Sequence, residues 1–237
     1  MIPIWLHEVA FACLAFGIVC AILIAIDLIN HPQRMWIMNI VWPVNGLFGT
    51  VLTLLLYYRF GRLAARDASK RSSGKKETPF PVMVAKGAMH CGAGCTLGDI
   101  VAESLVLAFP AIAIWAGWKT LFSDKMFAIW VVDYLFAFVL GVAFQYFTIK
   151  PMRDLSPSAG IVQAVKADTL SLTAWQVGMY GVMAIAQFAI FRRGLGVRLE
   201  PSMPEFWFMM QIAMIGGFLT SYPVNWWLIK AGVKERM

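Results

Sequence analysis

The stretch "IWLHEVAFACLAFGIVCAILIAIDLI", residues 4–29, decides the class of fold. Its side chains are almost all apolar, and a helix needs about 20 such residues to cross the hydrocarbon core of a bilayer. The stretch has no basic segment before it and is too long for the apolar core of a signal peptide. We therefore expect it to remain in the protein as a first transmembrane helix.

Five further windows of the chain are apolar over a comparable length. They comprise residues 36–58, 97–118, 126–149, 170–191 and 206–229. None of them shows the strict alternation of apolar and polar residues that is typical of a membrane β-barrel. The sequence thus predicts an all-α fold, a polytopic transmembrane helical bundle with about six spanning helices.

The composition of the chain agrees with this class. Hydrophobic residues make up 60% of the 237 residues and charged residues only 14%, whereas a soluble globular protein has about 45–50% apolar and about 25% charged residues. Charge this sparse cannot cover a surface in water, so lipid must be the solvent for most of the chain. No nucleotide, hydrolase or haem-attachment motif occurs, so the sequence predicts no enzyme class.

The lysines and arginines predict an orientation. When the polar loop between the second and third windows is placed in the cytoplasm, fourteen of the twenty fall on that side together with both chain termini. The six on the other side are Arg34, Lys119, Lys125, Arg192, Arg193 and Arg198. We therefore expect a multi-pass protein of the cell inner membrane with cytoplasmic N- and C-termini.

The excess of basic residues on one side of the membrane explains the net charge of +7 better than binding to nucleic acid does. Nucleic acid is therefore not an expected partner. Anionic lipid headgroups are the expected partner of the basic loop, and association into a homo-oligomer is left open. The polar run at residues 66–81 divides the chain. We expect an N-terminal two-helix part (1–65), a basic cytoplasmic linker (66–85) and a four-helix domain (86–237), packed as one bundle.

The segment "GAMHCGAGCTLGDIVAE", residues 87–103, differs from everything around it. On a continuous helix it would present one polar stripe, because residues four apart share a face. That stripe would comprise Cys91, Cys95, Asp99 and Glu103. However, the two glycines between the cysteines each disfavour a helix by about 1 kcal/mol, and a capping box opens at Thr96. We therefore expect a loop at 87–95 and a helix that begins near Thr96.

This segment is a candidate metal site, because thiolate, imidazole and thioether groups suit Cu(I) and Zn(II). The candidate ligands are Met89, His90, Cys91 and Cys95, with the carboxylates of Asp99 and Glu103 beside them. Carboxylates inside a spanning helix are functional or paired as a rule. Two alternatives remain: a thiol redox protein that uses Cys91 and Cys95, and an assembly subunit in which small residues only pack helices.

Polar and sulfur-containing side chains in the last three windows indicate an interior path. These residues are Asp133, Gln145, Gln176, Met179, Met183, Met210, Gln211 and Met214. They recur at helical spacing on the fifth window and suit the transfer of a soft ion. By contrast, we expect Asp168, Thr169 and Ser171 to cap the fifth helix, a purely structural role.

The chain resembles a prokaryotic family of multipass membrane proteins catalogued as domain-of-unknown-function family 4396. The resemblance rests on "HCGAGCTLGDIVAE" (90–103), "FQYFTIKPM" (144–152), "KADTLSLTAWQVGMYG" (166–181) and "FWFMMQIAMIGGFLTSYPVNWWLIKAG" (206–232). It implies the multipass architecture, with a family domain that begins near Pro81, and it brings no activity. The leading hypothesis is therefore a membrane protein that binds copper, or else zinc, and transports or delivers it.

Overall fold

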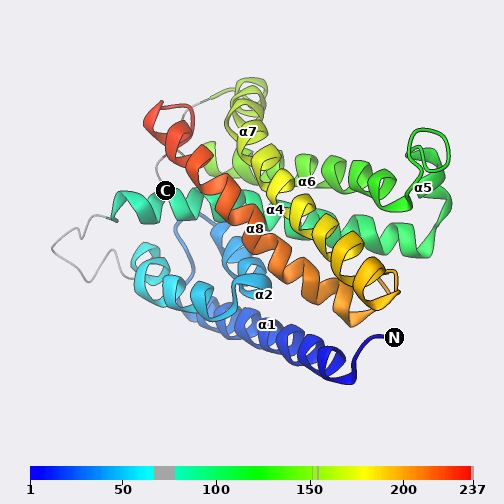
Figure 1. Cartoon of the computed structure of the whole chain (residues 1–237). Coiled ribbons are helices and arrows are strands. Elements are labelled where there is room, and N and C mark those ends of the chain that lie inside the picture. Colours follow the sequence, from blue (N-terminus) through cyan, green and yellow to red (C-terminus); the bar gives the residue numbers. More distant parts are fainter. Residues whose placement is uncertain (67–77, 151, 154, 236–237) are drawn as a thin grey trace.

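The computed structural model describes residues 1–66, 78–150, 152–153 and 155–235, and these residues form a bundle of helices (Figure 1). The helices are α1 (Ile4–Asn30), α2 (Met38–Leu56), α4 (Phe80–Ala108), α5 (Ala111–Trp115), α6 (Lys125–Ile149), α7 (Pro157–Ala184) and α8 (Pro204–Lys230). The π-helical segment η1 (Tyr57–Gly61) and the 3₁₀ turn η2 (Arg62–Ala64) extend α2, and the π-helical segment η3 (Ile185–Leu195) extends α7. The expected all-α fold is confirmed.

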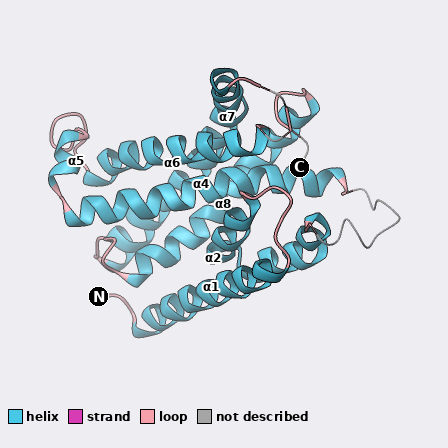
Figure 2. Cartoon of the chain, turned by 180° about the vertical axis from the view of Figure 1, so that it is seen from behind, coloured by secondary structure: helices cyan, strands magenta, loops and turns pink. Residues whose placement is uncertain are grey.

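Five long helices, α1, α4, α6, α7 and α8, run from one end of the bundle to the other (Figures 1 and 2). We call the end where α4 begins and α8 finishes the basic end, and the end that carries α5 the α5 end. The amino group of Met1 donates to the Leu195 carbonyl at the α5 end, whereas Lys234 lies beside Gly87 toward the basic end. The first and the last described residues therefore lie at opposite ends of the bundle.

The second apolar window does not cross the bundle but folds back on itself. Its helix breaks at Thr50, where φ is 40° and ψ is −118°. The amide of Arg34, before the break, donates to the carbonyl of Ala64 at 3.2 Å, and the amide of Arg66 donates to Pro32 at 2.9 Å. The segment therefore enters and leaves at the basic end. Its first half, residues 38–49, is about 18 Å long, too short for a hydrocarbon core of about 30 Å.

The tip of this re-entrant hairpin lies in the middle of the bundle. The side-chain amide of Gln211 on α8 donates to the carbonyl of Leu47 at 2.6 Å. On α1, Gly17 lets the same carbonyl approach closely, because any Cβ at that position would collide with it. Broken backbone at this depth is tolerated where protein groups satisfy it, and here α1 and α8 surround the tip.

The number of candidate spanning helices among the described residues is close to the expected count of about six. By length and apolar composition five helices can cross a membrane, including Met38–Ala64 but not α8. The polar and aromatic residues of α8 lower its mean hydropathy, yet it is 27 residues long and packs along α7. With the hairpin folded back, the helices that run the length of the bundle are α1, α4, α6, α7 and α8.

Helix α4 is the centre of the bundle and packs against α2, α6, α7 and α8. Its glycines permit this, since a Cβ at Gly94 would lie 2.9 Å from the Cα of Gly141, and one at Gly98 would lie 2.5 Å from the backbone nitrogen of Ala137. Small residues allow such close approach of membrane helices. The packing role that the sequence offered as an alternative thus explains these glycines.

Candidate functional site

The segment around the cysteines lies inside helix α4, which begins at Phe80. The expected loop at 87–95 and the expected helix start near Thr96 are both wrong, and the last residues of the expected linker, 80–85, are the first turns of this helix. The glycines that disfavour a helix in isolation are used for contacts with neighbours, so tertiary packing outweighs propensity. Because α4 is continuous, the stripe of Cys91, Cys95, Asp99 and Glu103 exists, and all four side chains are buried.

The four candidate ligands at the start of the stripe point toward different neighbours. Met89 packs in the hydrophobic cluster of α1 and α2, and the Nε2 atom of His90 lies 3.2 Å from Thr148 on α6. Cys91 faces α7, whereas Cys95 belongs to the main core. In the part of the chain that the structure describes, no three His, Cys, Asp or Glu side chains converge as a metal site. Copper at this position therefore stays a prediction.

Cys91 instead belongs to a buried polar cluster with two residues of α7. Its thiol donates to Oδ1 of Asp168 at 2.8 Å and lies 2.9 Å from the hydroxyl of Ser171. Asn225 on α8 donates to that hydroxyl at 2.6 Å and to the hydroxyl of Ser221 at 2.8 Å. Asp168 thus lies in the interior of α7 rather than at its start, so the expected cap is wrong. Ser156 caps the helix by accepting from the Ala159 amide.

Lys234, from the segment after α8, completes this cluster. Its side chain is fully buried, and its ammonium group donates to Oδ1 of Asn225 at 2.7 Å and to the carbonyl of Gly87 at 3.0 Å. It also lies 3.2 Å from the sulfur of Cys91 and 3.9 Å from Oδ1 of Asp168. The sequence counted this lysine among the fourteen positive charges of the cytoplasmic side, and the structure buries it next to a carboxylate.

A second buried group lies further along the stripe and consists of carboxyl and amide side chains. Asp99, Glu103 and Asp133 are each at most 3% exposed, and their charges are close enough to interact. Among the described residues, neither oxygen of Asp99 or of Asp133 has a hydrogen-bond partner. The amide of Gln176 lies near the Asp99 carboxyl, although outside hydrogen-bond geometry. Polar groups buried in this way require a bound proton, water or ion.

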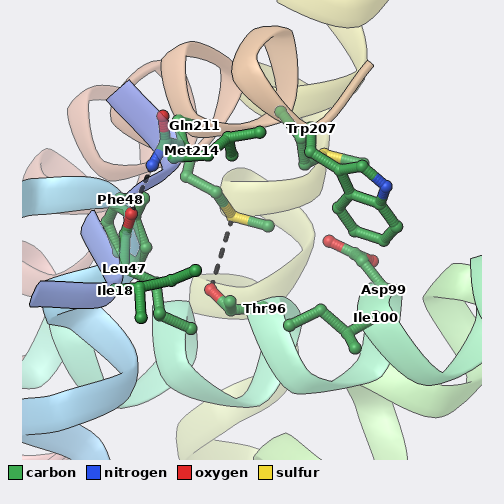
Figure 3. Close-up of a pocket in the computed structure, with 11 residues that line it drawn as sticks. Ile18, Leu47, Phe48, Thr96, Asp99, Ile100, Trp207, Gln211 and Met214 are labelled. Carbon is green, nitrogen blue, oxygen red and sulfur yellow. Dashed lines mark hydrogen bonds between the residues drawn. The ribbon is translucent and has the colours of Figure 1, made fainter. Parts of the chain in front are cut away.

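Asp99 also lines a cavity of about 290 Å³ between α1, α2, α4 and α8. Figure 3 shows its carboxyl group pointing into this space opposite the indole ring of Trp207. The walls are mostly apolar and are formed by Leu14, Ile18, Leu47, Phe48, Thr96, Ile100, Trp207, Met210, Gln211 and Met214. Leu47 and Phe48 come from the tip of the re-entrant hairpin. The cavity is thus lined both by a buried carboxyl group and by residues just before the break in α2 at Thr50.

A smaller cavity lies at the α5 end of the stripe. Glu103 lines it together with Lys125, Arg198 and Glu200. The last three belong to the start of α6 and to the chain between η3 and α8, so they lie where the bundle ends. The stripe on α4 therefore leads from the Lys234 cluster to a group of charged residues at the opposite end of the protein.

The structure buries most of the residues of the expected interior path. Met179, Met183, Met210 and Met214 pack in one core cluster with Cys95, and Gln145 is buried inside α6 without a hydrogen-bond partner in the described ranges. Gln211 differs, because its amide binds the carbonyls of Cys13 and Leu47. Only two of the four methionines, Met210 and Met214, line the large cavity.

The sequence did not predict that Asp168, Ser171, Ser221, Asn225 and Lys234 form a site. For Asp168 the sequence held a usable signal, namely that a helix can begin well before its apolar window. The predicted window began at residue 170, whereas α7 begins at Pro157 and includes Asp168. Its polar residues lower the local hydropathy although several are buried. For Lys234 the sequence offers no such signal, since a lysine just after a spanning helix usually faces water.

Comparison with known proteins gives one family. The model of a family described as Domain of unknown function (DUF4396) matches residues 82–234, more than half of the chain. This range begins close to Pro81, where the sequence predicted the start of the family domain. No curated protein and no solved structure matches.

Proposed function

Because the chain belongs to the family described as Domain of unknown function (DUF4396), whose description names no activity, we propose its function from the buried polar groups. The protein is a membrane carrier that binds a small cation beside Asp99 and moves it along the stripe on α4. Cu(I) is the expected cargo, and zinc is the second candidate. The α1–α2 unit, which the matched range does not include, supplies part of the binding cavity.

The observation that carries this proposal is the carboxyl group of Asp99. It is 1% exposed and points into the cavity, and within the described residues neither of its oxygens has a partner in hydrogen-bond geometry, although the Gln176 amide lies near. An ionised carboxylate is costly inside a membrane unless a cation neutralises it, so such residues mark ion pathways and proton relays. A cation bound in the cavity would supply that neutralising charge.

The re-entrant hairpin supports the same assignment. Discontinuous helices in transporters place their ends at the binding site, and helix C-terminal ends with free carbonyls favour cations there. In this chain the first half of α2 ends near Thr50, and its C-terminal turn presents Leu47 and Phe48 to the cavity. The partial negative charge at this helix end adds to that of Asp99.

The stripe gives the bound cation a route through the bundle. Cys91, Cys95, Asp99 and Glu103 are spaced by one helical turn and together cover about 18 Å along α4. One end of the route is the Lys234 cluster and the other is the small cavity at Glu103. Asp133 lies close enough to Glu103 and Asp99 to interact with both and adds a third carboxyl group to this part of the route.

Sulfur atoms along the route favour a soft cation. Met210 and Met214 line the large cavity together with Asp99, and Met179 and Met183 pack in the core cluster that contains Cys95. Thiolate and thioether ligands select Cu(I) over harder ions. The candidate ligands for Cu(I) are therefore Asp99, Met210 and Met214 in the cavity, with Cys91 and Cys95 along the path.

The other two hypotheses have less support. A thiol redox function needs reactive, accessible sulfur, whereas Cys91 and Cys95 are both 0% exposed. A pure packing role explains the glycines of α4, but it leaves the buried groups of Asp99 and Asp133 without a reason. A carrier function accounts for both the close packing of α4 and the buried carboxyl groups of Asp99 and Asp133.

We propose an orientation with the basic end in the cytoplasm of the inner membrane. Arg34, which the sequence placed on the opposite side, lies at this end beside Ala64, so the asymmetry of positive charge becomes larger than the sequence indicated. The C-terminus is then cytoplasmic and the N-terminus is on the outer side. Anionic lipid headgroups are the proposed partners of the basic end.

The test is uptake of Cu(I), kept reduced by ascorbate, into liposomes that contain the purified full-length protein and an internal copper-sensitive dye. Asp99→Asn preserves the shape of the side chain and removes its charge, so we expect uptake to fall at least tenfold while the protein stays folded. Glu8→Gln, an exposed carboxylate on α1, is the matched control and should transport at the wild-type rate. Equal uptake by Asp99→Asn and wild type, or uptake no faster than in empty liposomes, would refute the proposal.

A further inference from the structure

The buried ammonium group of Lys234 is surrounded in the way that a bound cation would be. Its neighbours are the Gly87 carbonyl, Oδ1 of Asn225, the Ser171 hydroxyl at 3.4 Å and the sulfur of Cys91, with a carboxylate oxygen of Asp168 at 3.9 Å. These five groups, which we call the lysine cage, come from α4, α7 and α8. All five belong to long helices of the bundle, whereas the lysine comes from the segment that follows α8.

The cage is built for one positive charge. Asp168 is its only carboxylate within the described residues, and it is 1% exposed. Its second oxygen, Oδ2, has no hydrogen-bond partner in the described part of the chain. One monovalent cation in place of the ammonium group would keep the charge balance, whereas a divalent cation would leave a buried excess of charge, which is costly.

The segment that carries Lys234 is attached weakly outside the cage. Gly232 has a φ of +71° and reverses the chain after α8, as glycine does at many helix C-termini. Beyond the backbone bonds of this turn, the segment is held by the Gln163 amide on the Val233 carbonyl and by the ion pair of Arg153 with Glu235. A partly exposed ion pair contributes about 0–1 kcal/mol, so the contacts of Lys234 itself hold the segment in place.

The cage also lies on the proposed route. Cys91 is both a member of the cage and the first residue of the stripe that leads to Asp99. A lysine in the cage therefore blocks this end of the route, and a cation that enters from the basic end must take its place.

We infer that the lysine cage is a binding site for a monovalent cation and that Lys234 is a tethered substitute which occupies it when no such cation is bound. This inference rests on the proposed carrier function and identifies the charge of the cargo. Exchange is electrically neutral: the ammonium group leaves toward water with the C-terminal segment as the free cation enters, and Asp168 keeps one positive partner throughout. No bond is made or broken covalently.

The test uses full-length protein in detergent and measures the thermal unfolding midpoint against increasing Ag(I), potassium or ammonium ion, each added alone. The variants are Lys234→Met, which removes the ammonium charge from the cage but retains the length of the side chain, and Lys230→Met, whose lysine is exposed on the same end of α8. A tethered group competes at millimolar effective concentration. We therefore expect at least one of these cations to bind Lys234→Met with an apparent Kd at least tenfold lower than it shows for wild type or Lys230→Met.

A second variant shows whether the cation binds in the cage. Lys234→Met/Asp168→Asn lacks the carboxylate, so the gain in affinity should disappear. If Lys234→Met does not fold in plain buffer, it is purified with each cation present; recovery by one of them supports the inference. Equal responses of all variants, or no recovery with any of the three cations, would overturn it.

Uptake of Cu(I) by wild-type protein in liposomes separates this inference from the function on which it rests. Wild-type uptake with no cation effect in Lys234→Met rejects the cage as a cation site and leaves the carrier intact. Cation binding in Lys234→Met without any wild-type uptake rejects the carrier and leaves the cage as a cation site.

Discussion

The sulfur of Cys91 on α4 lies 2.8 Å from Oδ1 of Asp168 on α7, with both side chains buried. This contact joins the cysteine segment to a carboxylate 77 residues further along the chain. It also brings the carboxylate within 3.9 Å of the Lys234 ammonium group. The thiol is thus fixed by hydrogen bonds to α7 and does not turn toward His90 or Met89. In this orientation the Cys91 thiol points away from Met89 and His90, two of the ligands that the sequence predicted to bind the same metal ion.

The first prediction concerns the charge balance of this cluster. Asp168→Asn leaves the Lys234 ammonium group buried without its counter-charge, and loss of one partner of a buried pair costs about 3–5 kcal/mol. The double variant Asp168→Asn/Lys234→Met removes both charges and should lose clearly less than the sum of the two single variants. Unfolding midpoints in detergent test this, and strictly additive losses would show that the two residues do not interact.

The second prediction concerns the close contact of α4 with α6. Gly98→Ala places a Cβ 2.5 Å from the backbone of Ala137, so the helices must move apart, at a cost of about 1–3 kcal/mol. Gly181→Ala is the matched control, because nothing lies within 4 Å of its Cβ, and replacing a helical glycine should stabilise by up to about 1 kcal/mol. The two variants should therefore shift the unfolding midpoint in opposite directions. A midpoint for Gly98→Ala at or above the wild-type value would contradict the packing described here.

The third prediction concerns the break at Thr50. A threonine with φ of 40° and ψ of −118° is strained, and such backbone costs about 1–3 kcal/mol. Thr50→Gly relieves this strain and should stabilise the protein. Thr53→Gly should destabilise it, because it removes the hydrogen bond from the Thr53 hydroxyl to the Asn45 carbonyl and places glycine inside a helix. Equal effects of the two substitutions would indicate an unbroken helix.

The fourth prediction concerns topology. Five crossings place the chain termini on opposite sides of the membrane, whereas six would place them together. Reporter domains that are active on only one side, fused in turn to each end of the full-length protein, distinguish the two arrangements. We expect a cytoplasmic signal from the C-terminal fusion alone, and cytoplasmic signals from both ends would restore the six-span prediction.

Much of the architecture was predictable because lipid imposes it. All six apolar windows contain helices, and 4–29 and 126–149 agree with α1 and α6 within one residue at each end. The helices α4 and α7 begin 17 and 13 residues earlier than the windows did. Hydropathy counts polar residues such as His90 and Asp168 as favouring water, and here the bundle buries each of them beside a partner on a neighbouring helix.

The re-entrant hairpin and the lysine cage were not predictable for a different reason. An apolar run of 27 residues is long enough for a crossing whether or not it turns back. The two cases are distinguished by tertiary contacts, such as the bonds from Arg34 to Ala64 and from Arg66 to Pro32. The four-residue spacing of Cys91, Cys95, Asp99 and Glu103 was enough to predict the stripe on α4, provided that the helix was continuous. Its partners on α7 and α8 depend on helix packing, which one sequence does not specify.

The hairpin also has a consequence for the order in which the protein is made. The carbonyl of Leu47 at its tip is bound by Gln211, which the ribosome adds 164 residues later. Until α8 is synthesised and inserted, the tip must remain near the membrane surface or in water, because an unpaired carbonyl is costly in hydrocarbon. The second apolar segment of the chain is therefore among the last to reach its final depth, and a nascent chain that stops before α8 holds an unfinished cavity.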